Sequence, residues 1–136
     1  DNHEIIPTTY KHNDKDIQLK LIDFEFSKHT YKDGVRKQLN GRCGTISFMA
    51  PEMVRGQRYN ELVDMWSIGV ITYSLLFDTY PIIYTQIRVP DSFKIHYMEN
   101  SKVNPAAIDF TKRLLVEDPN DRITAHEALQ HEWLQA

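Results

Sequence analysis

Hydrophobic and polar positions divide this chain into one strongly apolar run and several weaker segments. The run covers residues 62–77 (LVDMWSIGVITYSLLF) and is apolar on nearly every side rather than along one stripe. A helix with that pattern is expected in a protein interior, and the run is longer than a usual strand. It is also shorter than a membrane span and contains polar residues. We therefore predict a central, buried helix and no membrane insertion.

Asp64 is the unusual residue of this predicted helix. A carboxylate that enters a core is costly unless hydrogen-bond donors surround it. We expect Asp64 to accept hydrogen bonds from backbone amides or to pair with a cation elsewhere in the fold.

Two strand-like segments precede the central helix. They cover residues 4–6 and 17–24, and the polar stretch 8–16 separates them. We predict that they pair as a hairpin with a long solvated loop and that the second strand delivers Asp23 at its end. Residues 27–42 are basic, polar and aperiodic, which predicts a mobile loop.

Helix-start signals are found in the rest of the chain. Pro51-Glu52 places proline and a negative charge where a short helix can begin. Asn104-Pro105 supplies a cap and a first-turn proline before an apolar stripe, and residues 124–127 have the spacing of a capping box before a last amphipathic helix. Residues 92–98 are a weaker helix candidate. The predicted fold class is mainly α, with a small N-terminal β-hairpin.

Composition excludes several classes of protein. The chain has 136 residues, of which 41% are hydrophobic and 26% charged, as in one globular domain or a piece of a larger one. The net charge is −3 without a basic stripe, which argues against nucleic acid as a partner. No signal peptide is recognisable, and the missing initial methionine indicates processing or a start inside a longer gene product.

Cys43 is the only cysteine, so we predict no disulfide and a reducing, cytoplasmic location. His126 and His131 do not share a helix face, so they do not suggest a metal site.

Several motifs, taken together and in this order, resemble signatures of eukaryotic protein kinases. They are Leu21-Ile22-Asp23-Phe24-Glu25, Gly44-Thr45 with Ala50-Pro51-Glu52, Asp64-Met65-Trp66-Ser67-Ile68-Gly69-Val70, Tyr80-Pro81, and Asp121-Arg122-Ile123-Thr124-Ala125 with His131-Glu132-Trp133. The resemblance runs from about Ile17 to the end, and the last helix is most similar to the calcium/calmodulin-dependent serine/threonine kinases. It implies that residues 1–136 are a partial kinase domain, extending from the end of the catalytic loop through the activation segment to the C-terminal helices. The implied fold is a protein-kinase-like C-terminal lobe of an α+β parent fold.

The resemblance implies ATP and Mg²⁺ as cofactors and serine or threonine hydroxyls of a protein substrate as phosphate acceptors. Asp23 corresponds to the aspartate that binds magnesium. Asn2 corresponds to a second magnesium ligand, although it lies farther from Asp23 than in typical relatives. Thr45 corresponds to the threonine that orients the substrate hydroxyl. On their own, Asp23 and Thr45 would each fit a turn residue, and the motif context favours the functional interpretation.

Structural support is implied for four further residues. Glu52 and Arg122 resemble a buried ion pair that ties the end of the activation segment to the far helices. Asp64 resembles the aspartate that braces the catalytic loop from beneath, and Trp66 belongs to the same motif.

The chain departs from the family in ways that affect function. No catalytic aspartate, glycine-rich loop or paired lysine is present, so ATP binding would require the preceding lobe, and the isolated chain is not expected to be competent. Glu25 stands where the family has a glycine, and the implied effect of the glutamate is either to restrict the switching of the loop or to add a negative charge beside the phosphates. Gly41 occupies the usual regulatory phosphothreonine position, so we predict no activation there, and Thr30 and Tyr31 are the other candidate sites. Calcium-sensing regulation is a further implication. The alternative function is a non-catalytic remnant that acts as a binding or scaffold module.

Overall fold

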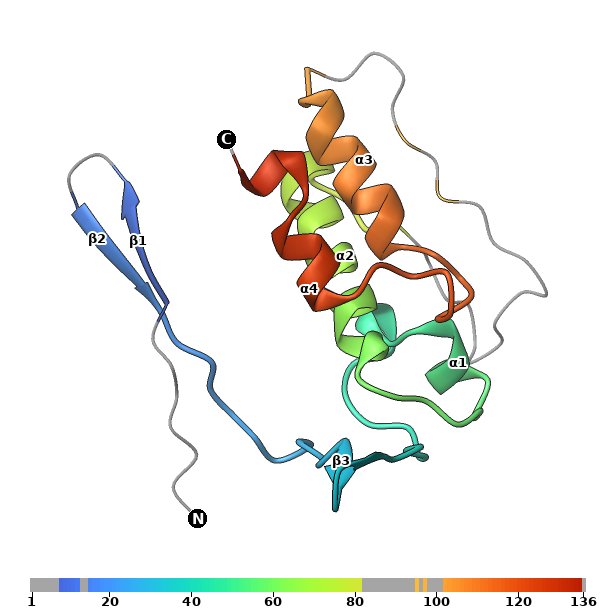
Figure 1. The fold of residues 1–136 in the computed structure, drawn as a ribbon. Helices are drawn as coiled ribbons and strands as arrows, with labels where there is room; N and C mark the ends of the chain where they lie inside the picture. The colour runs from blue at the N-terminus through green and yellow to red at the C-terminus, as the bar shows by residue number, and fades with distance from the viewer. Residues whose placement is uncertain (1–7, 13–14, 82–94, 96, 98–101, 136) are drawn as a thin grey trace.

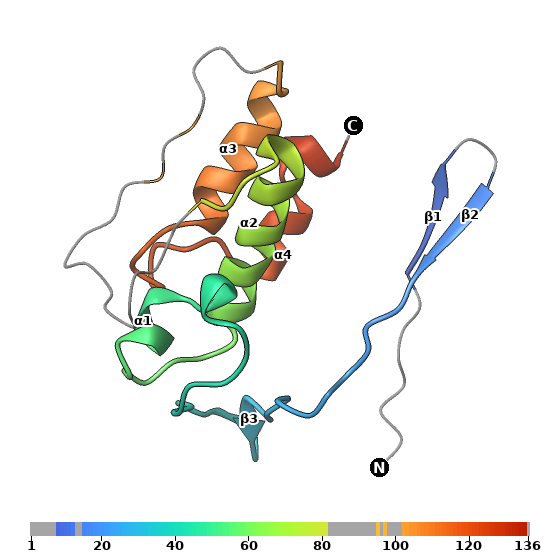
Figure 2. The same cartoon turned by 180° about the vertical axis from the view of Figure 1, so that it is seen from behind.

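The structure, a computed structural model, describes residues 8–12, 15–81, 95, 97 and 102–135. In chain order its elements are β1 (Thr8–His12), β2 (Lys15–Leu19), β3 (Tyr31–Lys32), β4 (Val35–Arg36), the 3-10 turn η1 (Ile46–Phe48), α1 (Pro51–Val54), α2 (Leu62–Phe77), α3 (Pro105–Leu114), α4 (Ala125–Leu129) and the 3-10 turn η2 (Glu132–Leu134). The helices form one body, and the β1–β2 hairpin stands away from it in both views (Figures 1 and 2). The fold is mostly helical with a small N-terminal antiparallel hairpin, as predicted, and a second two-stranded sheet, β3–β4, is also present.

Helix α2 is the element on which the other helices pack, and its bounds match the predicted central helix. Trp66 and Val70 are almost completely buried in the core. Burial is nevertheless incomplete, because Ile68, Ile71 and Leu75 are exposed on one side, Leu75 by 82%. The predicted burial of this central helix is therefore met on one side and not on the other among the described residues, since apolar character alone does not show which face has a neighbour.

The contact between α2 and α3 depends on a glycine. A β-carbon added to Gly69 would lie 2.8 Å from the Cβ of Leu114 and 2.9 Å from two side-chain carbons of Leu115. The absence of a side chain at residue 69 thus lets the two helices approach closely. Together with α4, they enclose an apolar cluster of Leu62, Met65, Phe110, Leu114 and Ala128.

Local capping signals are confirmed at three helices. Pro51 opens α1 at the first helical positions. The Asn104 side chain accepts a hydrogen bond from the Ala106 amide at the start of α3. At α4, Thr124 and Glu127 satisfy each other's backbone amides in a capping box. These short-range interactions explain why the sequence located these starts well.

The predicted last helix is shorter than expected. Helix α4 ends at Leu129, and the side chain of His131 accepts a hydrogen bond from the Trp133 amide to open the separate turn η2. Trp133 still packs on the core, with its ring centroid 5.1 Å from that of Phe110.

The N-terminal hairpin exists, but its strands differ from the prediction. Thr8–His12 pairs with Lys15–Leu19, so the stretch expected to be a solvated loop is mainly strand. Threonine and tyrosine favour extended backbone, which outweighed the polar composition. The second strand ends at Leu19 rather than continuing to Phe24, and the strand expected at residues 4–6 lies outside the described residues.

Residues 27–42 are not entirely loop, because β3 and β4 form a small hairpin within them. Asp33 and Gly34 connect the strands with φ angles of 52° and 76°. Two consecutive positive φ angles are typical of a type I′ turn, for which Asp-Gly is a preferred sequence. Asp33-Gly34 is thus a turn signal in the sequence, which the interpretation of residues 27–42 as a loop from their polar composition had overlooked. The helix candidate at 92–98 lies outside the described residues except for Ile95 and Tyr97, which are not helical.

Candidate functional site

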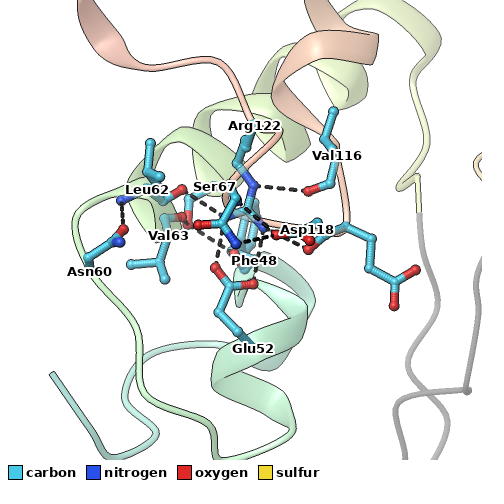
Figure 3. A network of polar contacts seen from close by, with 11 residues as sticks. Phe48, Glu52, Asn60, Leu62, Val63, Ser67, Val116, Asp118 and Arg122 are labelled. Atoms are coloured by element: carbon cyan, nitrogen blue, oxygen red, sulfur yellow. Dashed lines mark hydrogen bonds and ion pairs between the residues drawn. The ribbon is translucent and has the colours of Figure 1, made fainter. Parts of the chain in front are cut away.

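The centre of the candidate site's scaffold is an ion pair between Arg122 and Glu52 (Figure 3). The two guanidinium Nη atoms donate to the two Glu52 carboxylate oxygens at 2.8 and 3.0 Å, and the side chains are only 0% and 5% exposed. Arg122 also donates to the backbone carbonyls of Leu62, Val116 and Glu117 at 2.9, 3.0 and 3.3 Å. The buried charge is therefore surrounded by acceptors, as a desolvated guanidinium requires.

This ion pair joins three parts of the chain that are distant in sequence. Glu52 belongs to α1, Leu62 begins α2, and Arg122 follows the turn after α3. The Trp66 ring lies 5.2 Å from the Arg122 guanidinium carbon, which adds a cation–π contact from the middle of the core. The pairing predicted from the sequence is thus present, and it fixes the segment that carries Thr45 relative to α2.

Thr45 lies immediately before η1, in an exposed position. Its side chain makes no capping hydrogen bond to that turn. Behind it, the Ser67 hydroxyl of α2 donates to the Phe48 carbonyl at 2.9 Å and so attaches η1 to the central helix. The Thr45 hydroxyl is held by a well-anchored segment without being used to cap it.

A hollow of about 330 Å³ opens beside Thr45. Its walls include Lys28, Cys43, Thr45, Phe48, Asp64 and Ser67. The structure therefore brings two of the predicted site residues, Thr45 and Asp64, to the same hollow. Asp23 is not among the residues that line it.

Asp64 does not have the donors expected from the sequence. It is exposed, and no hydrogen bond or ion pair joins its carboxylate to another residue in the described part of the chain. Partial desolvation raises the pKa of Asp64, and the nearby negative charge of Glu61 raises it further. The prediction that this carboxylate finds a donor is thus not met within the described residues, although its position at the start of α2 is as predicted.

Asp23 lies in the connection between β2 and β3, where the backbone leaves regular structure. It is exposed and has φ = 65°, a left-handed conformation that aspartate tolerates better than most residues. Its apolar neighbours are also exposed, Ile22 by 82% and Phe24 by 48%. Glu25 is exposed in the turn that follows. Three or more metal-ligating side chains do not cluster anywhere in the described residues, so Asp23 supplies a single carboxylate. Asn2, the predicted second ligand, lies outside the described residues.

Sequence reasoning missed the contacts that hold the segment between Asp23 and Thr45. Lys28 donates to the Asn40 carbonyl and to the Tyr59 hydroxyl, and Arg36 of β4 pairs with Glu61 just before α2. These partners are 12 to 31 residues apart in the sequence, so no local sequence pattern predicts that they interact. Contacts of this kind can be recognised only when the three-dimensional fold is known.

Cys43 is a free, half-buried thiol in the structure. Among the described residues, no helix has both the length and the apolar character needed to cross a membrane.

Comparison with known proteins agrees with these features. The sequence model of the family described as "Protein kinase domain" matches residues 10–134. Calcium/calmodulin-dependent protein kinase type I of Schizosaccharomyces pombe is 39% identical over 131 residues, which cover 92% of this chain and 39% of that protein. Calcium/calmodulin-dependent protein kinase type IV of Mus musculus is 37% identical over 129 residues, covering 88% of this chain and 26% of that protein.

A further relative carries a different kinase name. Aurora kinase of Eremothecium gossypii is 36% identical over 119 residues, covering 86% of this chain and 32% of that protein. The chain thus spans less than two-fifths of the length of these relatives. Because the family match extends over nearly the whole sequence, this chain belongs to the protein kinase domain family.

Proposed function

We propose that this chain is the second half of the C-terminal lobe of a serine/threonine protein kinase. Joined to the preceding half of the domain, it transfers the γ-phosphate of ATP to serine or threonine hydroxyls of a protein substrate. The observation that carries this proposal is the buried Arg122–Glu52 pair, which holds Thr45 beside a hollow that Asp64 also lines. Phosphoryl transfer depends chiefly on positioning and electrostatics, so a rigid platform of this kind suits it.

Thr45 and Asp64 have separate roles in this proposal. The Thr45 hydroxyl, which does not cap η1, orients the acceptor hydroxyl of the substrate. The Asp64 carboxylate, which lacks a donor among the described residues, accepts hydrogen bonds from the backbone of the catalytic loop. This partner supplies the compensation that a partly desolvated carboxylate needs.

Asp23 is the proposed magnesium ligand of this chain, with Asn2 as a second ligand. Magnesium in kinase sites is held by one or two carboxylates together with substrate phosphates and water, rather than by a cage of protein side chains. The exposed single carboxylate of Asp23 fits that donor set. When bound, the ion would neutralise charge on the ATP phosphates, and the part of this chain is to offer one oxygen ligand.

We also propose a location and a mode of regulation for the complete protein. A single cysteine without a disulfide suits the cytoplasm. Two relatives are named as calcium/calmodulin-dependent kinases, and on that likeness we propose calcium-linked regulation for the complete protein.

The test is a phosphate-transfer assay of the complete protein that contains this chain, with Mg²⁺, ATP and a serine/threonine peptide library. Asp23→Asn should lower the rate by about 100-fold or more, because a charge that binds the metal is lost. Thr45→Ala should also lower the rate, and Thr45→Ser should retain most of it. Asp78→Asn, at the exposed C-terminal cap of α2, is the matched control.

Glu25→Gly decides how far the departure from the family matters. If glutamate restricts the backbone beside the phosphates, the glycine variant should be faster than the unmodified protein. A folded complete protein without phosphate transfer, in both its unmodified and Glu25→Gly forms, would contradict the proposed function and support a non-catalytic module.

A further inference from the structure

Lys28 is the centre of a small polar cluster on the segment between Asp23 and Thr45. Its ammonium group donates to the backbone carbonyl of Asn40 at 2.8 Å and to the hydroxyl of Tyr59 at 3.0 Å. The Tyr59 hydroxyl in turn donates to the same Asn40 carbonyl at 3.3 Å, and the ammonium lies 5.5 Å from the centre of the Tyr59 ring. Each of the three groups therefore contacts the other two.

This cluster joins the two ends of the segment to the core. Lys28 follows Asp23 closely in sequence, and Asn40 shortly precedes Thr45. Tyr59 is the fixed member, because it is only 4% exposed and belongs to the main apolar cluster. The contacts of Lys28 and Asn40 with Tyr59 therefore hold both ends of residues 28–40 against the core. They set the positions from which the chain continues toward Asp23 at one end and toward Thr45 at the other.

Two further contacts act in the same direction. Leu39 and Tyr59 exchange both backbone hydrogen bonds, at 2.7 and 3.0 Å, in an isolated antiparallel bridge. Arg36 donates through its Nε atom to Glu61 at 3.1 Å. Tyr59 and Glu61, the partners of Leu39 and Arg36, both lie just before α2. The segment between Asp23 and Thr45 is therefore attached beside the N-terminal end of the central helix.

Gly41 lies next to the Lys28 ammonium. A β-carbon on residue 41 would be 3.8 Å from Nζ, and the φ angle of +90° disfavours any residue with a side chain. Residue 41 itself therefore offers no hydroxyl that could carry a phosphate beside this cation. The backbone carbonyl of Asn40 serves as the acceptor instead.

We propose that Lys28 is a positioning residue for phosphate transfer, which ties Asn40 to Tyr59 and so holds the segment between Asp23 and Thr45 in place without phosphorylation. This inference depends on the proposed function for its effect on rate. The hydrogen bond with Tyr59 raises the pKa of Lys28, so the ammonium stays charged at neutral pH.

The experiment compares Lys28→Met with Lys28→Arg, Tyr59→Phe and the control Lys32→Met in the complete protein. Methionine keeps the length of the side chain and removes its charge, and Lys32 is an exposed lysine on β3. The readouts are kcat and KM for peptide and for ATP, limited proteolysis within residues 28–42, and the melting temperature. Treatment of the unmodified protein with a phosphatase tests whether phosphate is needed.

Lys28→Met should lower kcat/KM for peptide by about tenfold, the size expected for losing a charged hydrogen bond. It should also speed cleavage within residues 28–42, while the melting temperature and KM for ATP stay close to those of Lys32→Met. Lys28→Arg should recover most of the peptide kinetics, Tyr59→Phe should lie between, and phosphatase treatment should change nothing. A Lys28→Met variant that behaves like Lys32→Met in an active protein, or phosphatase treatment that abolishes activity, would overturn the inference alone. An inactive unmodified protein would overturn the proposed function itself, and with it the effect of Lys28 on rate.

Discussion

Gly69 of α2 lies directly against Leu114 of α3. A β-carbon at residue 69 would come within 2.8 Å of the Leu114 Cβ atom, a distance that real Cβ contacts essentially never show. Because Leu114 is fully buried, its Cβ has no room to retreat without moving α3. The spacing of the two helices that carry most of the core is therefore set by one missing methyl group.

Gly69→Ala should accordingly destabilise the protein. Alanine is the better helix former by up to about 1 kcal/mol, so an uncrowded site would gain stability. The clash should instead produce a net loss of about 1–3 kcal/mol, as in other overpacked cores. Urea unfolding monitored by circular dichroism measures the change.

The double variant Gly69→Ala with Leu115→Ala separates crowding from other causes. Two of the three short contacts involve Leu115 side-chain carbons, so shortening that residue should make the added methyl less costly. A Gly69→Ala variant as stable as the unmodified protein would show that the helices are not this close. A coupling free energy near zero would show that the Leu115 side chain does not crowd the added methyl group.

Removing either partner of the Arg122–Glu52 pair should be far more damaging than breaking a surface pair. Glu52→Gln leaves a buried guanidinium without its counter-charge, and the expected loss is about 3–5 kcal/mol. Arg122→Met should cost at least as much, because it also leaves three backbone carbonyls without their donor. Equal stability of Glu52→Gln and the unmodified protein in urea would refute the buried arrangement.

Arg113→Ala provides the matched control for this pair. Arg113 and Asp109 are also joined by an ion pair, but their side chains are 59% and 49% exposed. Solvent screening limits such surface pairs to about 0–1 kcal/mol. The difference in stability loss between Glu52→Gln and Arg113→Ala would therefore measure the effect of burying an ion pair, rather than the effect of having one.

The features that were predictable from the sequence depend on short-range interactions. Asn104 with Ala106, and Thr124 with Glu127, interact within one helical turn, so the sequence contains both partners of each cap. The length and apolar character of residues 62–77 were enough to define the bounds of α2. The same pattern could not show that Leu75 would be exposed, because exposure depends on which neighbour covers a face.

Residues of the candidate site were predictable from the sequence only where they belong to a recognisable motif. Thr45 and Asp64 were singled out by their motifs, and the structure places both at one hollow. The Lys28–Tyr59 contact spans 31 residues and combines common residue types, so nothing in the sequence distinguishes it. Long-range pairs of this kind require the fold before they can be recognised.

Asp109 predicts how stability responds to acid. The hydrogen bond from Arg113 lowers the pKa of Asp109, and the contact with His131 lowers it further. A carboxyl with a lowered pKa contributes stability that is present above its unfolded pKa and is lost as pH falls through the folded value. Stability should therefore decline below about pH 4, the usual range of an aspartate. Asp109→Asn should flatten this decline modestly, because the side chain is half exposed, as urea midpoints between about pH 2.5 and pH 7 can show.

Asp64 should respond in the opposite sense in the 136-residue chain. Partial desolvation and Glu61 raise the pKa of Asp64, so folding disfavours its charged form. The resulting cost is present above the folded pKa and disappears below the unfolded pKa. Asp64→Asn should thus leave this chain equally or more stable at pH 7, with the difference vanishing at about pH 3. In the complete protein, the same change should instead lower phosphate transfer, because we propose that the catalytic loop supplies the donors for the carboxylate. A large loss of stability in the isolated chain at pH 7 would mean that Asp64 already has a partner there, and it would remove the reason for assigning that role to the preceding segment.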